Sequence, residues 1–375
     1  MSKDSKTDGL RLGVVGCGGV ARIAMAPVIR YLENAQLCAV MDPDKARAEF
    51  ISNTYGPCEV YTDYDRMLEQ ADIDAVMVCS PVYTHEDNVV KAALAHKHVF
   101  CEKPLARTVG ECDRMIRACR ENDVKLMVGV MKRFNPCFQE AARMIRQGIL
   151  GNVFHVDVLW ESYSMGAPKN WHHSLEALGG GFQDHASHTV DLAAWWLGDV
   201  RSVDGKFHII QEHAEVEDAG IAFLRHAGDA ISVHQLIINV SHRRDLESYR
   251  IHGTNGVLEM WFEGGSWSSN QPFHMRFFEK GRIETQINLF DIDPSIVDPE
   301  GRIRGYNAYY RELEHFCRCV LEDTQPAQDG AEGRKVVEVI NATYLSSAQE
   351  RSITLPLSEE VDLERIFIDA KRAVR

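Results

Sequence analysis

The stretch LRLGVVGCGGVA, from Leu10 to Ala21, decides the fold of this chain. A short apolar run, LRLGVV, ends in the turn GCGGVA, and a helical pattern follows over residues 19–33. A strand, a glycine-rich turn and a helix in this order open the domains that bind dinucleotides. Pro27 lies inside the helical pattern, where it predicts a kink because proline cannot donate a helix hydrogen bond.

Each position of the turn has a physical role in a nucleotide site. Gly16 permits a tight turn, Gly18 lets a pyrophosphate approach the backbone, and Ala21 keeps the helix close to the strand. The first N–H groups of the helix then point towards the phosphates. The candidate cofactor-binding residues of the turn are therefore Gly16, Gly18, Gly19, Val20 and Ala21.

Further apolar runs alternate with helical patterns over the first third of the chain. They are LCAVMD, DAVMVCS, HVFCEK and KLMVGV, which begin at residues 37, 74, 98 and 125. Continuous apolar runs separated by helices indicate a parallel sheet that is covered on both faces. We therefore expect residues 1–130 to form an α/β domain, a Rossmann-type doubly wound parallel sheet that binds the cofactor.

Asp42 ends the second of these runs and bears on the choice of cofactor. A carboxylate at this place can accept hydrogen bonds from the adenosine ribose hydroxyls, and it would repel a 2′-phosphate. The sequence continues Pro43-Asp44-Lys45, with no arginine directly after the acid. NAD is therefore favoured over NADP, although Lys45 and Arg47 leave room for both.

The composition excludes several classes of partner. The formal charge of −14 argues against nucleic acid or an anionic membrane as the main partner. No apolar stretch is long enough for a membrane helix, and the polar first residues do not resemble a secretory signal. The 10 cysteines show no metal-knuckle spacing and are expected to be reduced thiols in a cytoplasmic protein.

Residues 131–375 have a different pattern. From Val153 onward, apolar and polar residues alternate along several runs, as antiparallel strands with one covered face require. We expect an α+β domain with an open, mostly antiparallel sheet that holds substrate and forms a homodimer or homotetramer. The helical patterns at 306–322 and 331–349 are expected to return and cover the first domain. The segment 291–305 is the most loop-like part of the chain.

Two places carry side chains suited to catalysis. Lys103 follows a strand of the first domain, where a cation could stabilise an alkoxide. GGGFQDHASHTVD, residues 179–191, supplies Asp184, His185, His188 and Asp191. If residues 184–196 are helical, Asp184, His188 and Asp191 share one face and His185 points elsewhere. The cluster could be a metal site, a proton relay or a structural polar patch; the nucleotide domain favours the relay and no metal.

The sequence resembles the glucose–fructose oxidoreductase and inositol dehydrogenase family (Gfo/Idh/MocA). The motifs that carry the resemblance are GCGGVA, CSPVYTH, VFCEKPLA, KRFNP and GGGFQDHASH, in that order. It implies that Lys103, Asp184 and His188 are catalytic and surround a substrate beneath the nicotinamide. It further implies that the cofactor is bound by Ser80, Pro81, His85, Glu102, Lys103 and Arg133.

This sequence departs from the family pattern at a few positions. Val82 replaces a polar residue after the Ser-Pro pair, which puts one cofactor contact in doubt. His172 and His173 follow Trp171 where many members carry an arginine, so the substrate contacts can differ. Tyr163, Trp171 and His172 are the candidate substrate-binding residues, and Asp191 and the Trp195-Trp196 pair are assigned structural roles.

These observations predict an NAD-dependent oxidoreductase that acts on a secondary hydroxyl or keto group of a sugar, a glycoside, a nucleotide sugar or a cyclitol. His188 or Lys103 would be the immediate base, and Asp184 would orient a hydroxyl or the imidazole. Three alternatives stay open. One is a glycosidase or lyase of the same fold that uses bound NAD without net redox change, the second is a non-catalytic protein that senses NAD, and the third is a metal-dependent hydrolase.

Overall fold

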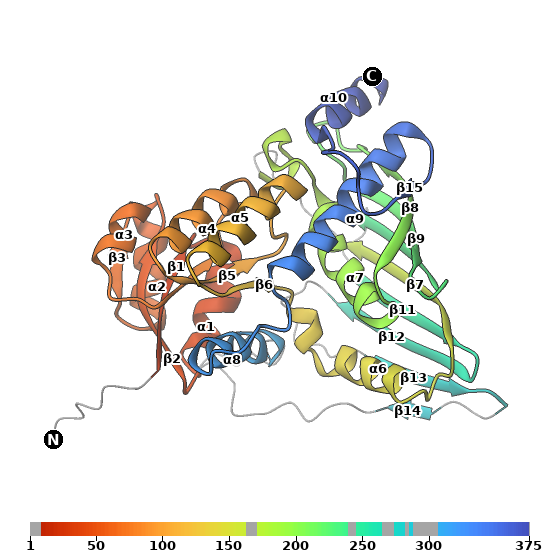
Figure 1. Ribbon diagram of the computed structural model, residues 1–375, viewed down its shortest axis with the longest axis horizontal. Coiled ribbons are helices and arrows are strands. Elements are labelled where there is room, and N and C mark those ends of the chain that lie inside the picture. The colour runs from red at the N-terminus through yellow and green to blue at the C-terminus, as the bar shows by residue number, and fades with distance from the viewer. Residues whose placement is uncertain are drawn as a thin grey trace. The chain divides into compact units, whose positions relative to one another are not determined.

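The computed structural model describes residues 9–162, 171–238, 245–264, 274–281, 285–287 and 307–374. The chain divides into two compact units (Figure 1). Unit 1 takes its described residues from Met1–Ala106, Glu111–Met131 and Pro294–Gly333, and unit 2 takes them from Arg107–Gly110, Lys132–Asp293 and Arg334–Arg375.

Unit 1 is built on a parallel sheet with the strand order β3-β2-β1-β4-β5-β6. This order is that of the dinucleotide-binding fold, in which the chain turns back between the first and fourth strands. The predicted Rossmann-type sheet is therefore confirmed. Its strands are β1 (Leu10–Val15), β2 (Ala35–Met41), β3 (Glu59–Tyr61), β4 (Ala75–Val78), β5 (His98–Glu102) and β6 (Leu126–Gly129).

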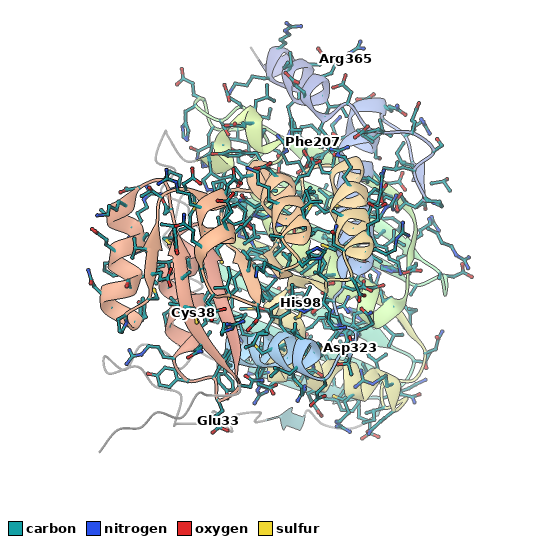
Figure 2. The ribbon with its side chains drawn as sticks, turned by 60° about the vertical axis from the view of Figure 1, so that its left-hand side comes forward. Glu33, Cys38, His98, Phe207, Asp323 and Arg365 are labelled. Atoms are coloured by element: carbon teal, nitrogen blue, oxygen red, sulfur yellow. The ribbon has the colours of Figure 1, made fainter. Side chains whose placement is uncertain are left out.

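Helices lie on both sides of this sheet. Figure 1 shows α3 (Tyr64–Gln70), α4 (His85–Leu94) and α5 (Val109–Glu121) above it and α8 (Asn307–Leu321) below it. The short helix α1 (Ala26–Ile29) contacts both α8 and α2 (Lys45–Tyr55). Asp323, labelled in Figure 2, follows α8, and its Oδ1 lies 2.7 Å from Nζ of Lys125 just before β6. The helix α8 thus belongs to unit 1, although it comes late in the chain.

Two details of unit 1 differ from the sequence prediction. The expected helix over residues 19–33 is a π-helical turn, Ala21–Met25, followed by α1, which ends at Ile29. Pro27 stands at the start of α1, where a missing N–H is tolerated, so the π-turn takes up the irregularity that the proline imposes. The short edge strand β3 was not predicted, because EVY is too short and too polar to form an apolar run.

Unit 2 is built on a second, mixed sheet. Over the described residues its strand order is β14-β13-β12-β11-β7-β10-β9-β8-β15, and the β7–β10 pair is parallel while its other pairs are antiparallel. The predicted open, mostly antiparallel sheet is confirmed. The strands are β7 (Val153–Ser162), β8 (Val200–His208), β9 (Ala219–His226), β10 (Ile231–Ile238), β11 (Asp245–Gly253), β12 (Gly256–Gly264), β13 (His274–Glu279), β14 (Thr285–Ile287) and β15 (Ile353–Thr354).

One face of this sheet is covered by helices. The residues that pack on it come from α6 (Pro136–Arg146), α7 (Gly181–Leu197), α9 (Gly330–Gln349) and α10 (Leu363–Val374). Phe207 of β8, labelled in Figure 2, contacts Tyr344 of α9 and Phe367 of α10 with ring centroids 5.4 and 5.5 Å apart. The helix α7 occupies the middle of this layer, on β10, β9 and β7.

The opposite face of the sheet is more exposed. Strand residues alternate there with the buried ones, as period two requires. Ile221 of β9 is 44% exposed, and half-buried apolar neighbours accompany it on β9, β10 and β7: Phe223, Val233, Ile237 and Leu159. Ion pairs flank this apolar region, among them Arg250–Glu259 at 2.7 Å.

The structure bears on two expectations from composition: membrane helices and the state of the cysteines. None of the helices in the described ranges is long and apolar enough to cross a membrane. All of the cysteines lie in described residues and are free thiols, and burial raises the pKa of several of them, that of Cys17 to about 12.

Candidate active site

The glycine-rich turn of unit 1 has room for a ligand. Gly16 has a φ of +88°, and a Cβ there would lie 2.5 Å from the backbone nitrogen of Ser80. Glycine is therefore required at this turn, as the sequence indicated. Gly18 and Gly19 have no neighbouring atom within 4 Å of where a Cβ would stand. The turn is thus tight on its inner side and open on the side where the helix begins.

Asp42 lies directly after β2 and next to the turn. Its Oδ2 accepts a hydrogen bond from the N–H of Cys17 at 2.8 Å, and its Oδ1 accepts one from the N–H of Asp44 at 2.9 Å. The side chain is 7% exposed. Each carboxylate oxygen accepts more than one hydrogen bond, so the acid can brace the turn and still accept ribose hydroxyls.

The basic residues that left room for NADP are engaged locally. Nζ of Lys45 lies 3.0 Å from Glu49, and Nε of Arg47 lies 3.3 Å from Asp44. Both pairs are solvent-exposed and therefore weak.

The stretch CSPVYTH forms the loop after β4 and the start of α4. Asn88 donates to Oγ of Ser80 at 2.9 Å, and Pro81 begins a short 3₁₀ turn over Val82–Thr84. Val82 is 2% exposed and packs into the core. A polar side chain in this direction would be buried, so the departure from the family pattern at Val82 serves packing.

His85 connects two loops of unit 1. Its Nε2 lies 2.8 Å from the carbonyl oxygen of Ser80, and its Nδ1 lies 3.0 Å from that of Pro104. The ring is 1% exposed, and burial lowers its pKa against the effect of these carbonyls, which raise it. A contribution of His85 to a cofactor site therefore runs through the backbone segments that it joins, rather than through its own ring.

Lys103 follows β5 on the second of those loops. Glu102, the last residue of β5, is 6% exposed, and its Oε2 accepts a hydrogen bond from the N–H of Lys103 at 3.1 Å. Lys103 itself is half-buried, whereas Pro104 behind it is buried. The strand end thus holds the backbone of the lysine in place. Its location at the carboxyl end of a parallel strand is where the sequence placed it.

In unit 2 the motif GGGFQDHASHTVD forms the start and middle of α7. The helix begins at Gly181, three residues earlier than the sequence interpretation assumed. Asp184 and His188 are one turn apart on it. The Asp184 side chain is 26% exposed and His188 is 7% exposed. The two groups therefore differ in solvation, with the carboxylate nearer to solvent than the imidazole.

The glycines before α7 have a role inside unit 2. A Cβ on Gly180 would overlap the carbonyl oxygen of Glu217, and a Cβ on Gly181 would meet Ile238 of β10. The close approach seen within unit 2 is between the start of α7 and the sheet.

An aromatic ring lies beside both histidines of the motif. The ring of Trp160 of β7 stacks on that of His188 with centroids 6.2 Å apart, and it meets His185 edge-on at 4.2 Å. Nζ of Lys132 lies 3.7 Å from the centroid of Trp160 and pairs with Glu247. Lys132 is 4% exposed, so a buried cation supports the ring that packs on His188.

His185 and Asp191 both form hydrogen bonds within unit 2, and for Asp191 this agrees with the structural role predicted from the sequence. Nδ1 of His185 lies 2.8 Å from the carbonyl oxygen of Gly181 within the same helix. Asp191 is 1% exposed and accepts two hydrogen bonds from Arg133, at 2.8 and 2.7 Å. Arg133 was expected at the nicotinamide. In unit 2 its Nε and Nη2 hold α7, and its cofactor role stays a prediction.

The remaining candidates lie before α7. Trp171 and His172 form a short 3₁₀ turn, and their rings stack with centroids 3.6 Å apart. Tyr163 and the segment 291–305 lie outside the described residues. Trp196 is 7% exposed in a core cluster, where the sequence placed it. Over the described ranges, no group of three or more His, Cys, Asp or Glu side chains is arranged to hold a metal ion.

The sequence patterns did not assign three of these residues to the site. Trp160, Lys132 and Glu217 act on α7 from other segments of unit 2. Trp160 looks like one more apolar residue of an alternating strand, and Lys132 looks like a surface charge. A local pattern does not report that they meet the helix, because the register of the sheet decides this.

Two family models match the chain. The model described as "Oxidoreductase family, NAD-binding Rossmann fold" matches residues 10–130, and the model "GFO/IDH/MocA C-terminal domain" matches residues 138–259. Together they account for well over half of the sequence.

Individual proteins are similar over nearly the whole length. The myo-inositol 2-dehydrogenase of Thermotoga maritima is 28% identical, over 92% of this chain and 98% of its own. The inositol 2-dehydrogenase of Rhizobium meliloti is 29% identical, over 92% and 99%. The crystal structure of the WlbA dehydrogenase from Bordetella pertussis, in complex with NADH and UDP-GlcNAcA, aligns with a TM-score of 0.78 at 25% identity, over 93% of this chain and 99% of that one.

Proposed function

Since this chain belongs to the GFO/IDH/MocA family of oxidoreductases with an NAD-binding Rossmann fold, we propose that it is an NAD-dependent dehydrogenase or reductase. Its substrate is a sugar, a sugar derivative or a cyclitol, and the reaction takes place at a secondary hydroxyl or keto group of that molecule. Unit 1 binds the cofactor, and unit 2 binds the substrate and forms the contacts between subunits.

The observation that supports this most directly is the turn between β1 and the π-turn. Gly18 and Gly19 leave open space at the start of the helical segment, and Asp42 stands beside them with a carboxylate at the end of β2. Backbone N–H groups at such a turn suit a pyrophosphate, and the carboxylate suits ribose hydroxyls. The donors and the acid therefore fit NAD, whereas the buried acid disfavours the 2′-phosphate of NADP.

The chemistry divides between the cofactor and the chain. When bound, NAD supplies the acceptor for the two electrons and the hydrogen that leave the substrate carbon. The chain has to move the proton of the hydroxyl and to exclude competing reactions. Histidine and lysine can take that proton, since each is a weak base when neutral.

We assign three catalytic side chains. His188 or Lys103 accepts the proton from the substrate oxygen during oxidation and returns it during reduction. As a cation, Lys103 also stabilises negative charge on that oxygen. Asp184, one turn before His188 and partly solvated, orients a neighbouring hydroxyl. The reaction needs no metal in this assignment.

The substrate class rests on two observations. Two relatives similar over nearly their whole length are inositol dehydrogenases, and the aligned dehydrogenase structure contains a nucleotide sugar. In this chain, the stacked Trp171 and His172 add an aromatic surface and a polar edge shortly before α7. Aromatic faces bind the apolar faces of sugars and cyclitols, and polar edges bind their hydroxyls.

Replacing Lys103 tests the proposal. The change is Lys103→Ala, and we expect it to lower kcat by roughly 100-fold or more, the usual effect of losing a general acid or base. The affinity for NAD, measured by fluorescence titration, should stay close to that of the unchanged protein. The assay follows NADH absorbance while inositols, sugars, glycosides and nucleotide sugars are screened. Lys91→Ala, which changes a half-buried lysine of α4 in the same unit that pairs with Asp65, is the control.

Three outcomes would contradict the proposal. Full activity of Lys103→Ala would remove the lysine from the site. Substrate turnover without net NADH formation, together with NAD released only on denaturation, would identify a redox-neutral enzyme of the same fold instead. If the unchanged protein binds NAD and turns over none of these compounds, the function is sensing rather than catalysis.

We also propose that the chain self-associates through the exposed face of the unit 2 sheet. Half-buried apolar side chains lie at the centre of this face, and paired charges surround them. A surface with an apolar centre and a polar rim is typical of protein interfaces. Because the rim carries both signs of charge, a two-fold axis can bring it against a second copy of itself.

A further inference from the structure

The helix that carries Asp184 and His188 is capped from a distant part of unit 2. Helices usually begin with a Ser, Thr, Asp or Asn whose side chain accepts a free backbone N–H. Here the position before α7 is Gly180, which has no side chain. The carboxylate of Glu217, just before β9, accepts the N–H of Gly180 with both oxygens at 2.8 Å and the N–H of Gln183 at 3.1 Å.

The backbone of Glu217 takes part in the same cap. Its carbonyl oxygen accepts the N–H of Gly181 at 3.1 Å, so one residue binds three N–H groups at the start of the helix. A side chain at position 180 would overlap this carbonyl. The glycine is therefore what allows Glu217 to approach, and no residue at position 180 could replace the cap with its own side chain.

Glu217 is itself held in place. It is completely buried, and the hydroxyl of Tyr344 on α9 donates to its Oε1 at 2.9 Å. The ring of Tyr344 packs on Phe207 of β8 and Phe367 of α10, and it contacts Phe182 of α7. The position of the carboxylate is thus determined by the sheet and by two helices, and this position is transmitted to the first turn of α7.

A neutral residue would be easier to bury at this place. Burial raises the pKa of Glu217 to about 7, although the hydrogen bonds from Gln183, Gly180 and Tyr344 lower it. The titratable group that faces it from α9 is Tyr344, α7 presents backbone N–H groups, and the neighbouring Asp218 directs its oxygens to the N–H groups of Ile210 and Gln211. A carboxyl group kept at such a buried site argues for a role that depends on its geometry.

We propose that Glu217 is a positioning residue for catalysis: by holding the N–H groups of Gly180, Gly181 and Gln183, it sets the location of Asp184 and His188 on α7. The N–H of Asp184 donates to the carbonyl of Gly180 at 3.0 Å, so the capped residue and the candidate catalytic residue belong to one helical turn. A shift of the Glu217 carboxylate would therefore move the first turn of α7, and Asp184 with it. This inference rests on the proposed function, which assigns Asp184 and His188 to the reaction.

The test is the isosteric change Glu217→Gln. It keeps the volume but presents an NH₂ group to N–H donors, which disrupts the cap. We expect kcat to fall roughly 10- to 100-fold, the effect of displacing a catalytic group by about 1 Å. The KM for substrate should change much less than kcat, and the Kd for NAD should stay within about twofold, because the reacting groups are displaced rather than lost. Hydrogen exchange of a peptide that spans residues 178–184 should become faster.

Two further variants complete the test. Glu338→Gln is the matched control, since Glu338 is a buried carboxylate of unit 2 that accepts a backbone N–H from Leu357 rather than from α7. It should leave kcat and the exchange of residues 178–184 unchanged. Tyr344→Phe keeps the ring and removes one donor to Glu217. We expect faster exchange of the same peptide and a smaller fall in kcat, and the effects of Tyr344→Phe and Glu217→Gln should not add.

The outcomes separate this inference from the proposed function. The activity of the unchanged protein decides the function by itself, whereas hydrogen exchange needs no substrate. Wild-type exchange of residues 178–184 in Glu217→Gln would overturn the inference, whether or not the protein is active. Faster exchange with an unchanged kcat would also overturn it, because the cap would then be structural. If Glu217→Gln does not fold, unchanged exchange in Tyr344→Phe gives the same negative answer.

Discussion

At the scale of single residues, the carboxylate of Asp42 has a structural role in addition to its proposed role in cofactor binding. It accepts the N–H of Cys17 in the glycine-rich turn and the N–H of Asp44 at the start of α2. The acid that is suited to ribose hydroxyls therefore also shapes the turn that is suited to the pyrophosphate. Cofactor choice and turn geometry are coupled through this side chain.

Removing the charge of Asp42 should weaken NAD binding. We expect Asp42→Asn to raise the Kd for NAD about 10- to 100-fold, because hydrogen bonds to a charged group contribute about 1.5–3 kcal/mol. The preference for NAD over NADP should narrow, since the repulsion of a 2′-phosphate is lost. Titrations with both cofactors measure this. Asp44→Asn is the control, because Asn still caps α2. Wild-type affinities for both cofactors in Asp42→Asn would refute the assignment.

At the scale of elements, α7 is held along its whole length. Glu217 binds its start, and Arg133 binds Asp191 in its middle. Breaking a buried ion pair of this kind by removing one partner is strongly destabilising, since the remaining charge stays buried. A helix held in this way keeps the spacing of Asp184 and His188 constant.

A chain of hydrogen bonds adds to this support. The carbonyl of Gly198, after α7, lies 2.8 Å from Nδ1 of His226 and can only accept, so Nδ1 donates. Nε2 of His226 then accepts from Ser232, whose Oγ accepts from Nε2 of His234, each at 2.9 Å. Nδ1 of His234 accepts from Thr189 at 3.0 Å. Burial lowers the pKa of both imidazoles, which favours the neutral rings that these bond directions require.

Glu217 and His234 titrate in opposite senses. Burial raises the pKa of Glu217 from 4.5 to about 7, so between these pH values the folded chain binds the extra proton. Burial lowers the pKa of His234 from 6.5 to about 3, so between these two pH values the unfolded chain binds one more proton at this residue than the folded chain does. As the pH falls, Glu217 therefore increases the free energy of unfolding and His234 decreases it. From pH 6.5 to 4.5 the two contributions oppose each other.

Replacing either residue should reveal how the other one changes the free energy of unfolding with pH. Between pH 6.5 and 4.5, the Glu217→Gln variant should lose about 2 kcal/mol more of its free energy of unfolding than the unchanged protein, since the slope is at most about 1.4 kcal/mol per pH unit. His234→Asn should lose less than the unchanged protein over the same range. Urea unfolding followed by circular dichroism at several pH values measures both. Parallel curves for all three proteins would show that neither group titrates in this way.

At the scale of the whole molecule, the unit 2 sheet has one face covered by helices and one face left more open. The covered face buries two apolar clusters, whereas the other face keeps Ile221 and its apolar neighbours half-exposed. Apolar groups gathered on one surface of a folded chain mark an interaction site more often than a solvated face. This is the physical basis of the proposed self-association.

A charge at the centre of the open face should separate the subunits. We expect Ile221→Lys to convert the protein from a dimer or tetramer towards the monomer, because a buried unpaired ammonium opposes association. Light scattering after size exclusion gives the mass. Leu94→Lys, at an apolar residue of α4 that is 63% exposed, is the control and should keep the assembly. An unchanged mass for Ile221→Lys would place the interface elsewhere.

Much of this protein could be read from local sequence. The run LRLGVV followed by GCGGVA predicted β1 and its turn, since Gly16 alone allows the approach of Ser80. Period-two alternation predicted the second sheet, and helical spacing predicted α7, α8 and α9 to within a few residues. The position of Lys103 at a strand end followed from the same patterns. These features depend on residues that are neighbours in the chain, and their periodicity is visible there.

The tertiary structure alone decided which side chains support the site. Glu217 reaches Gly180 across 37 positions of sequence, and Arg133 reaches Asp191 across 58. The segment EVY became a strand because β2 offered it an edge, and Pro27 fitted because a π-turn precedes it. Sheet register and helix packing bring such groups together, and neither is encoded in any local period. The sequence by itself determined the elements and the candidate chemistry, whereas long-range packing determined how α7, the helix with the candidate catalytic residues, is held.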